Sequence, residues 1–241
     1  MYINYNWEIN MKLDWSKVPQ MEKFLAALQI IHECKMCGKC CVGMAGIAYN
    51  STDTVRMAKT LGIPRNEFVK EYTTASTKQP KDRWLNTKGN DHECIFWSKN
   101  GCTKYEGRGQ VCRLYPWTSP EQLNSIKAKK GWHIYPKCRG MQETYLKVLD
   151  AAKKMPLETA QAILKSPLGN ICMLNLVRDM YNDESALFSA KELGLPQVPA
   201  MEELKSMAWN YAVACVTLYT PQRWQQDFEM ISAELAKWET T

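Results

Sequence analysis

Hydrophobic residues recur at helical spacing in the segment that leads to the first cysteines. Between residues 16 and 31 they lie mostly three or four positions apart: Met21, Phe24, Leu25, Leu28 and Ile31. This period predicts one amphipathic helix over residues 16–31, which delivers the chain to the cysteines.

The next fifty residues alternate between short apolar runs and turn signals. GMAGIAYN predicts a short strand, and Ser51 and Thr52 can cap a following helix that Gly62 ends. Pro64 can open a second short helix that runs toward Tyr72. The polar stretch TTASTKQPKD predicts a loop.

An Asn-Gly pair lies between two cysteines in ECIFWSKNGCTKYE. Asn-Gly is the strongest short signal for a tight hairpin turn. We therefore expect a hairpin that brings Cys94 and Cys102 close together.

After Cys138 the pattern changes to helical segments separated by prolines. The clearest helix has one apolar face, and Thr220 with Pro221 can open a final helix. The residues of that face are Leu204, Ala208, Tyr211, Cys215 and Leu218. We expect an α+β, mostly helical protein, in which a small cysteine-rich metal-binding domain with short strands precedes a helical bundle. Its expected parts are an N-terminal amphipathic helix (1–30), the cysteine-cluster domain (31–140) and a helical domain (141–241).

Composition and charge narrow the class of protein. The 241 residues are 45% hydrophobic with a net charge of +6, and basic residues are scattered apart from Lys127, Lys129 and Lys130. Such a mild charge does not indicate a nucleic-acid partner. The sequence shows neither a membrane-spanning stretch nor a signal-peptide pattern, so we expect a cytoplasmic protein with no membrane partner.

Ten cysteines are heavy usage for a chain in a reducing compartment, where thiolate ligands explain close cysteines better than disulfides do. Four of them form CKMCGKCC: Cys34, Cys37, Cys40 and Cys41. Two-residue gaps let thiolates converge on one metal, and Gly38 keeps the turn open. The adjacent pair is expected to point apart, so that its members serve different metals or only one of them is a ligand.

Four more cysteines follow in polar contexts: Cys94, Cys102, Cys112 and Cys138. The eight thiolates fit two four-cysteine sites, or one cluster with spare thiols for catalysis or metal delivery. The spacing suits an iron-sulfur cluster, expected to be 4Fe-4S, and it also suits zinc. Cys172 and Cys215 lie in apolar helical segments, where core packing is expected.

Other side chains near the cysteines are further candidates. His32, His92 and His133 can ligate zinc or some iron-sulfur centres, or lie behind the ligands or on the surface. Arg108 and Arg113 flank a later cysteine, where a guanidinium offsets thiolate charge and raises a reduction potential, or forms a surface ion pair. Four tryptophans can pack in the core or shield a cluster from water: Trp84, Trp97, Trp117 and Trp132.

Residues 31–142 resemble the YkgJ-type CxxCxxCC cysteine cluster family, described as zinc- or iron-chelating. The likeness rests on CKMCGKCC, LGIPRNEFVKEY, ECIFW, GCTKYE, CTKYEGRGQVCRLYPW and KCRG. Two positions depart from the family pattern, because its Arg-Pro is Arg108-Gly109 here and its closing Cys-Pro-Gly is Cys-Arg-Gly at 138–140. A glycine loosens the turn that a proline would fix ahead of Cys112.

The resemblance implies metal binding by all eight cysteines. The family is similar to the flagellin lysine-N-methylases, in which a similar cysteine set accompanies methyl transfer from S-adenosylmethionine. The chain has neither a glycine-rich strand-to-helix loop nor a C-x3-C-x2-C run, so its residues do not independently indicate an adenosylmethionine site.

Three functions follow as hypotheses. The first is an iron-sulfur protein that serves electron transfer or the redox-dependent modification of a protein partner or substrate, with the eight cysteines as ligands. The second is a zinc-binding structural or interaction module. The third is an enzyme like the lysine methylases. Whether the protein is an enzyme stays open at this point.

Overall fold

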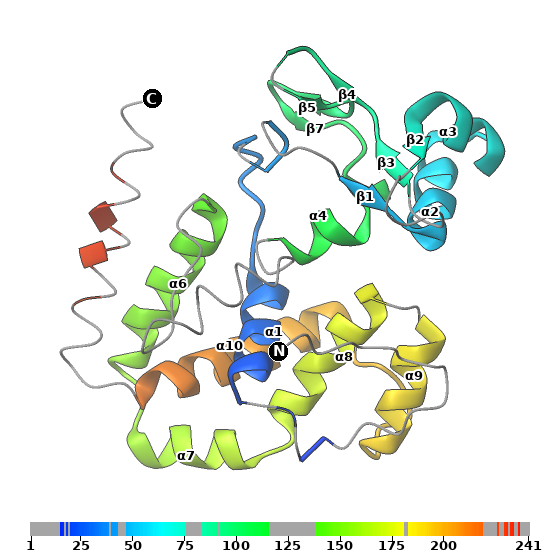
Figure 1. The fold of residues 1–241 in the computed structure, drawn as a ribbon. Coiled ribbons are helices and arrows are strands. Elements are labelled where there is room, and N and C mark those ends of the chain that lie inside the picture. Colours follow the sequence, from blue (N-terminus) through cyan, green and yellow to red (C-terminus); the bar gives the residue numbers. More distant parts are fainter. Residues whose placement is uncertain are drawn as a thin grey trace. The chain divides into compact units, whose positions relative to one another are not determined.

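The computed structural model divides the chain into two compact units, drawn as ribbons in Figure 1. The helical unit comprises residues 1–33 and 119–241, and the cysteine unit comprises residues 34–118. The structure describes residues 15, 16, 18, 20–38, 40–42, 47–75, 83–90, 92–115, 138–180 and 183–218, with single positions at 226, 229, 230, 232, 233 and 236.

The first described helix of the helical unit is α1 (Gln20–Ile31). Its later helices are α6 (Arg139–Ala152), α7 (Leu157–Lys165), α8 (Leu168–Met180), α9 (Asp183–Glu192) and α10 (Met201–Thr217). Helix α10 packs against α1, α6, α7 and α8, so it lies at the centre of this unit (Figure 1). The N-terminal helix therefore packs with helices from the far end of the chain.

The predicted apolar faces of the first and last of these helices are largely confirmed. Phe24, Leu25 and Leu28 of α1 are buried, although the helix begins at Gln20 and not at residue 16. On α10 the predicted core residues Leu204, Ala208, Tyr211 and Cys215 are buried. Leu218 was expected on the same face, but it follows the last helical turn and is 45% exposed.

The described part of the cysteine unit contains three small antiparallel sheets. The first has the order β1 (Ala48–Tyr49), β3 (Arg83–Leu85), β2 (Thr73–Ala75). The others pair β4 (Thr87–Lys88) with β5 (Glu93–Cys94), and β6 (Trp97–Ser98) with β7 (Gly101–Cys102). Helices α2 (Ser51–Leu61), α3 (Arg65–Tyr72) and α4 (Gln110–Leu114) and the 3-10 turn η1 (Tyr105–Gly107) complete it.

Most local predictions for this unit hold, with small shifts. Asn50, and not Ser51 or Thr52, caps α2, because its side chain accepts the N–H of Asp53. Gly62 ends α2 in the left-handed conformation at φ 72°, and Pro64 directly precedes α3. Residues 73–75 were expected in a loop, but they form β2 because they pair with β3.

The predicted hairpin is confirmed with its turn one residue earlier. Ser98 pairs with Gly101, so Lys99 and Asn100 form the turn and Gly101 begins β7 at φ 105°. Only glycine adopts that backbone conformation readily. The hairpin thus carries Cys102 at its end.

Aromatic rings in contact with one another form much of the core of the cysteine unit. Phe68 lies 5.9 Å from Tyr49 and 5.5 Å from Tyr72 between ring centroids, and Tyr72 lies 5.8 Å from Phe96. Phe68 is fully buried, and Met57 and Leu85 pack into the same cluster. This row of rings ties β1, α3 and the segment after β5 together.

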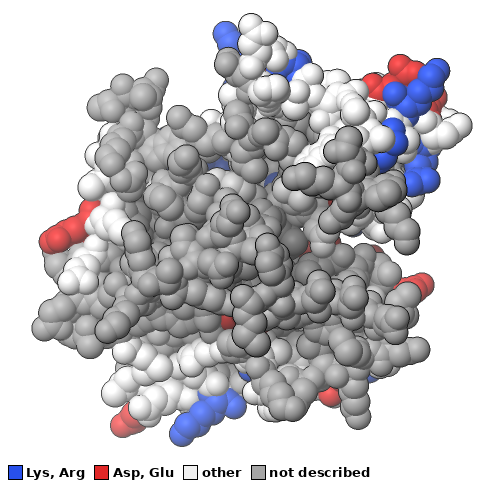
Figure 2. Space-filling view, viewed as in Figure 1, with Lys and Arg blue, Asp and Glu red and all other residues white. Residues whose placement is uncertain are grey.

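The structure confirms a mostly helical α+β protein with a few short strands. No described helix has the length and hydrophobicity that crossing a membrane requires. On the face drawn in Figure 2, described basic and acidic side chains are scattered among one another. The predictions for Lys127, Lys129, Lys130, Trp117, Trp132, His133, Thr220 and Pro221 lie outside the described residues.

Candidate metal centre

The first cysteine run folds into a tight turn at the start of the cysteine unit. Gly38 has φ 81°, and its carbonyl accepts the N–H groups of Cys41 and Val42 at 2.7 and 2.9 Å. The Met36 N–H donates to the Cys34 sulfur at 3.4 Å. Cys34 is half-buried and Cys37 is exposed. Local hydrogen bonds therefore hold this turn without any helix or strand.

This turn packs against the β6–β7 hairpin at two glycines. A Cβ on Gly38 would lie 2.4 Å from the Trp97 ring, and one on Gly101 would lie 2.5 Å from the Met36 sulfur. Both distances are too short for any side chain, so each glycine permits a close approach. Trp97 thus packs against the cysteine turn, and the hairpin holds Cys102 in the same region.

Cys40 and Cys41 do not point apart as the sequence suggested. Their sulfur atoms lie 3.9 Å from each other, within hydrogen-bonding distance for thiols. This contact lowers the pKa of Cys40 to about 7 and raises the pKa of Cys41, because a hydrogen bond between the two sulfurs favours one thiolate beside one thiol. The pair is therefore suited to act together at one centre.

Three later cysteines join this region from β5, β7 and α4. The Cys94 N–H donates to the Cys41 carbonyl at 2.7 Å, so a backbone bond links the two cysteine sets directly. Burial, together with the charges of Cys94, Cys40 and Cys102, raises the pKa of Cys112 to about 12. Burial also raises the pKa of Cys94, with a contribution from Cys102. The expected proximity of Cys94 and Cys102 is thus supported.

Two cations lie among these thiols. The Arg108 guanidinium stacks 3.4 Å above the centre of the Tyr105 ring, and its Nε donates to the Tyr105 carbonyl at 2.9 Å. Its charge opposes the rise in pKa that burial causes at Cys34 and Cys112. Lys88, which donates to the Trp97 carbonyl, acts in the same way on Cys94. Arg108 therefore has the charge-balancing place that the sequence suggested, and Lys88 is an addition.

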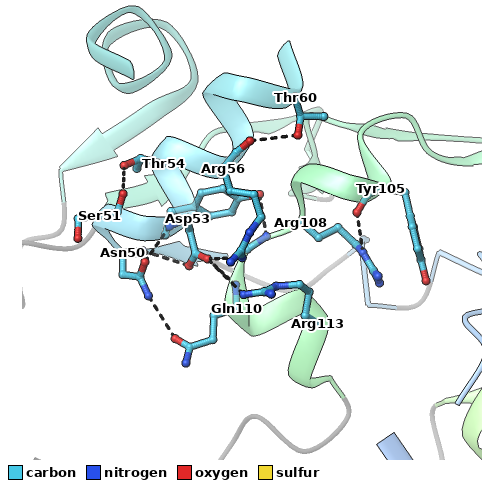
Figure 3. Close-up of polar contacts among 12 residues, drawn as sticks. Asn50, Ser51, Asp53, Thr54, Arg56, Thr60, Tyr105, Arg108, Gln110 and Arg113 are labelled. Carbon is cyan, nitrogen blue, oxygen red and sulfur yellow. Dashed lines mark hydrogen bonds and ion pairs between the residues drawn. The ribbon is translucent and has the colours of Figure 1, made fainter. Parts of the chain in front are cut away.

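Arg113 lies elsewhere, although it also flanks Cys112. Its guanidinium is 4.0 Å from the carboxylate of Asp53, which is only 2% exposed. Arg56 lies 3.5 Å from the same carboxylate (Figure 3). Burial raises the pKa of Asp53, whereas the bonds from Gln110 and Asn50 and the two arginines lower it. Sequence reasoning missed Asp53, although its place three residues after Asn50 is capping-box spacing.

The eighth candidate, Cys138, belongs to the helical unit. It is buried at the N-terminal cap of α6, with its sulfur 4.0 Å from His32 Nε2. Gly140 allows this approach, because a Cβ there would lie 2.6 Å from the His32 ring. His32 is therefore beside a candidate ligand, whereas His92 is exposed in a turn at φ 51°.

Cys172, Cys215 and Trp84 lie on other elements than the thiols of the two cysteine sets. Cys172 and Cys215 are buried in α8 and α10, which confirms that they pack in the helical core. Burial raises the pKa of each to about 12. Trp84 is half-buried in β3.

The donor chemistry of the cysteine unit fits a thiophilic metal. Seven thiols in one small unit, with cations beside them, are the ligand type that zinc and iron-sulfur clusters use. Within the described ranges, no three His, Cys, Asp or Glu side chains are gathered closely enough to hold a metal ion as they stand. Metal binding would therefore have to draw the thiols closer together.

Comparison with known proteins gives one match. Residues 33–138 match the model of the CxxCxxCC family, described as "Putative zinc- or iron-chelating domain". No curated protein and no solved structure matches the chain. This part of the chain is thus similar to a family that is described as metal-chelating, and the likeness to lysine methylases stays a prediction from sequence.

Proposed function

We propose that the cysteine unit binds an iron-sulfur cluster through its thiolates and serves electron transfer or the redox-dependent modification of a protein partner. The observation that carries the proposal is the joining of two cysteine sets far apart in sequence. Cys94 donates to the Cys41 carbonyl at 2.7 Å, and the Cys102 hairpin packs on the first cysteine turn through Trp97. The match over residues 33–138 supports metal chelation by this region.

The ligands would come from both cysteine sets of the cysteine unit: Cys34, Cys37, Cys40, Cys41, Cys94, Cys102 and Cys112. Cys138, the eighth cysteine that the sequence suggested, belongs to the helical unit. A bound iron-sulfur cluster supplies one-electron transfer. Arg108 and Lys88 would offset the negative charge of a thiolate-bound centre and raise its reduction potential.

Zinc is the second candidate, and the small secondary structure of the cysteine unit favours it. The described strands of this unit are only two or three residues long. Strands this short give little stability alone, whereas a structural zinc site contributes folding energy directly. The family description includes zinc as well as iron.

The proposal includes a partner and a location. An electron carrier or a redox-dependent modifier acts on another molecule, and we expect a protein in that role. Thiolate ligands persist best in a reducing compartment, so the proposal places the protein in the cytoplasm.

The test is purification without oxygen and without added metal, followed by assays on one sample. A brown protein with iron and acid-labile sulfide in similar amounts would support the iron-sulfur proposal. A colourless protein with stoichiometric zinc would overturn it in favour of the structural module. A sample with neither metal would contradict both.

A further inference from the structure

Helix α4 carries Cys112 but has little intrinsic stability. It has five residues, and its N-cap, Gly109, has no side chain to accept its first N–H groups. A helix this short is not stable alone, because few hydrogen bonds repay the cost of ordering it. Its place must be fixed by the residues around it.

Asp53 supplies the missing cap from another helix. One carboxylate oxygen accepts the Gln110 N–H at 2.9 Å, at the first residue of α4. The other oxygen accepts the Asn50 N–H at 3.3 Å and closes the capping box of α2. One buried carboxylate therefore satisfies the N-termini of two helices (Figure 3).

Tyr49 fixes the residue before α4. Its hydroxyl oxygen accepts the Gly109 N–H at 3.2 Å, and a Cβ on Gly109 would lie 2.8 Å from its ring. The Tyr49 ring is itself 1% exposed and packs on Phe68 in the aromatic core. The hydroxyl is thus held at a fixed place in the unit.

The bond between Tyr49 and Gly109 lies at the position where the family pattern has a proline and this chain has a glycine. Gly109 has φ −66°, a value that proline also adopts, so the glycine is not needed for its backbone angle. A proline would fix the turn but has no N–H to donate. In this chain the Tyr49 hydroxyl restrains the segment that a proline would stiffen.

Two arginines balance the negative charge of the Asp53 carboxylate. Arg56 and Arg113 approach one of its oxygens at 3.5 and 4.0 Å, and the Asn50 amide donates to the Gln110 side chain at 3.3 Å. A buried carboxylate is stable only with such partners. Arg113 follows Cys112 directly, so the carboxylate contacts α4 on both sides of that cysteine.

We propose that Asp53 and Tyr49 are positioning residues for Cys112, which hold the start of α4 so that the thiol is presented to the metal centre at one place. The role in metal binding rests on the proposed function. The restraint on the thiol does not, because the hydrogen bonds from Gly109 and Gln110 that provide it involve no metal.

The test measures alkylation of single cysteines by iodoacetamide in the metal-free protein, by mass spectrometry. In Asp53→Ala the rate at Cys112 should rise at least about tenfold, because a charge-assisted bond is lost. In Tyr49→Phe it should rise by about threefold, because only one neutral bond is lost. The rate at Cys94, in the same core, should change by less than about twofold in both variants, because loss of one local bond does not open the whole unit.

Two further variants separate positioning from general destabilisation. Asp53→Asn keeps a carbonyl acceptor, so its Cys112 rate should lie between those of the native protein and Asp53→Ala. Thr73→Val removes buried hydrogen bonds to Val69 and Arg83 within the same unit, away from α4, and should affect Cys94 and Cys112 equally.

Metal affinity, measured by competition with a chelator, gives the second readout. It should fall at least about tenfold in Asp53→Ala and less in Tyr49→Phe, following the same loss of hydrogen bonds. Equal acceleration of Cys94 and Cys112 in Tyr49→Phe, which keeps the core intact, would overturn the proposal. If the native protein binds no metal, the proposed function fails while the alkylation ratio still decides the positioning role.

Discussion

The two units hold their cysteines in opposite ways. In the helical unit, Cys172 and Cys215 lie on helices of 13 and 17 residues and are buried among apolar side chains. In the cysteine unit, the thiols lie on turns, on two-residue strands and on the five-residue α4. The helical unit can thus hold these two thiols by packing alone, whereas the described part of the cysteine unit has little regular structure where its thiols lie. We infer that metal ligation stabilises the turns, strands and short helix that carry the thiols of the cysteine unit.

Removing the metal should have the largest effect and should separate the two units. Structural metal sites with thiolate ligands contribute on the order of 10 kcal/mol to folding. We expect chelation to abolish amide protection from hydrogen exchange in β3 to α4 while α10 stays protected. Hydrogen exchange with mass spectrometry measures both regions in one sample. Equal loss of protection in α10 would show that the units do not differ in this respect.

Replacing one cysteine in each unit sharpens the comparison. Cys37→Ser removes an exposed thiol of the first run and should lower metal affinity by about a hundredfold, roughly 2.7 kcal/mol. Cys215→Ser changes a buried thiol of α10 and should leave metal content unchanged, although it lowers stability. Metal assays on both purified variants measure this. Equal metal loss would refute the assignment of ligands to the cysteine unit.

Three glycines test how tightly the cysteine turn is built. Gly38, Gly62 and Gly194 all have left-handed backbones, at φ 81°, 72° and 76°. Alanine at each costs about 1 kcal/mol for that conformation. A Cβ meets nothing within 4 Å at Gly62 or Gly194, but it meets Trp97 at 2.4 Å at Gly38.

We therefore expect Gly38→Ala to cost about 3 kcal/mol, because overpacking adds to the backbone term. It should also weaken metal binding, because Trp97 must move away from the cysteine turn. Gly62→Ala controls for the cysteine unit and Gly194→Ala for the helical unit. Thermal unfolding and metal titration of the three variants provide the measurements, and a uniform loss of stability would argue against tight packing at Gly38.

The sequence predicted local structure well wherever one residue decides it. Gly62 ends α2, and the hydrophobic period of α1 and α10 placed their buried faces. The contacts that build the candidate site are long-range, so no local pattern reports them. The Asp53 to Gln110 bond spans 57 positions, and the packing of Trp97 on Gly38 depends on the whole fold.

Predictions for residues close together in the sequence failed because their environments also depend on the fold. Cys40 and Cys41 were expected to diverge because neighbouring side chains do so in regular structure, yet a tight turn brings their sulfurs to 3.9 Å. Arg108 and Arg113 looked equivalent on either side of Cys112. Only the fold shows that Arg113 pairs with Asp53 while Arg108 stacks on Tyr105.

The smallest predicted effect concerns an exposed cation in each unit. Lys88 lies near Cys94, and Lys205 pairs with Glu202 at 3.0 Å on the surface of α10. Because Lys88 is exposed, water and salt screen its charge. Lys88→Gln should therefore weaken metal binding by less than about tenfold, and by less still at high salt. Lys205→Gln should leave metal affinity unchanged at every salt concentration, since Lys205 pairs with Glu202 in the helical unit. Competition with a chelator at two ionic strengths measures the metal affinity of both variants. An equal change in affinity in the two variants would mean that the position of Lys88 near Cys94 has no specific effect.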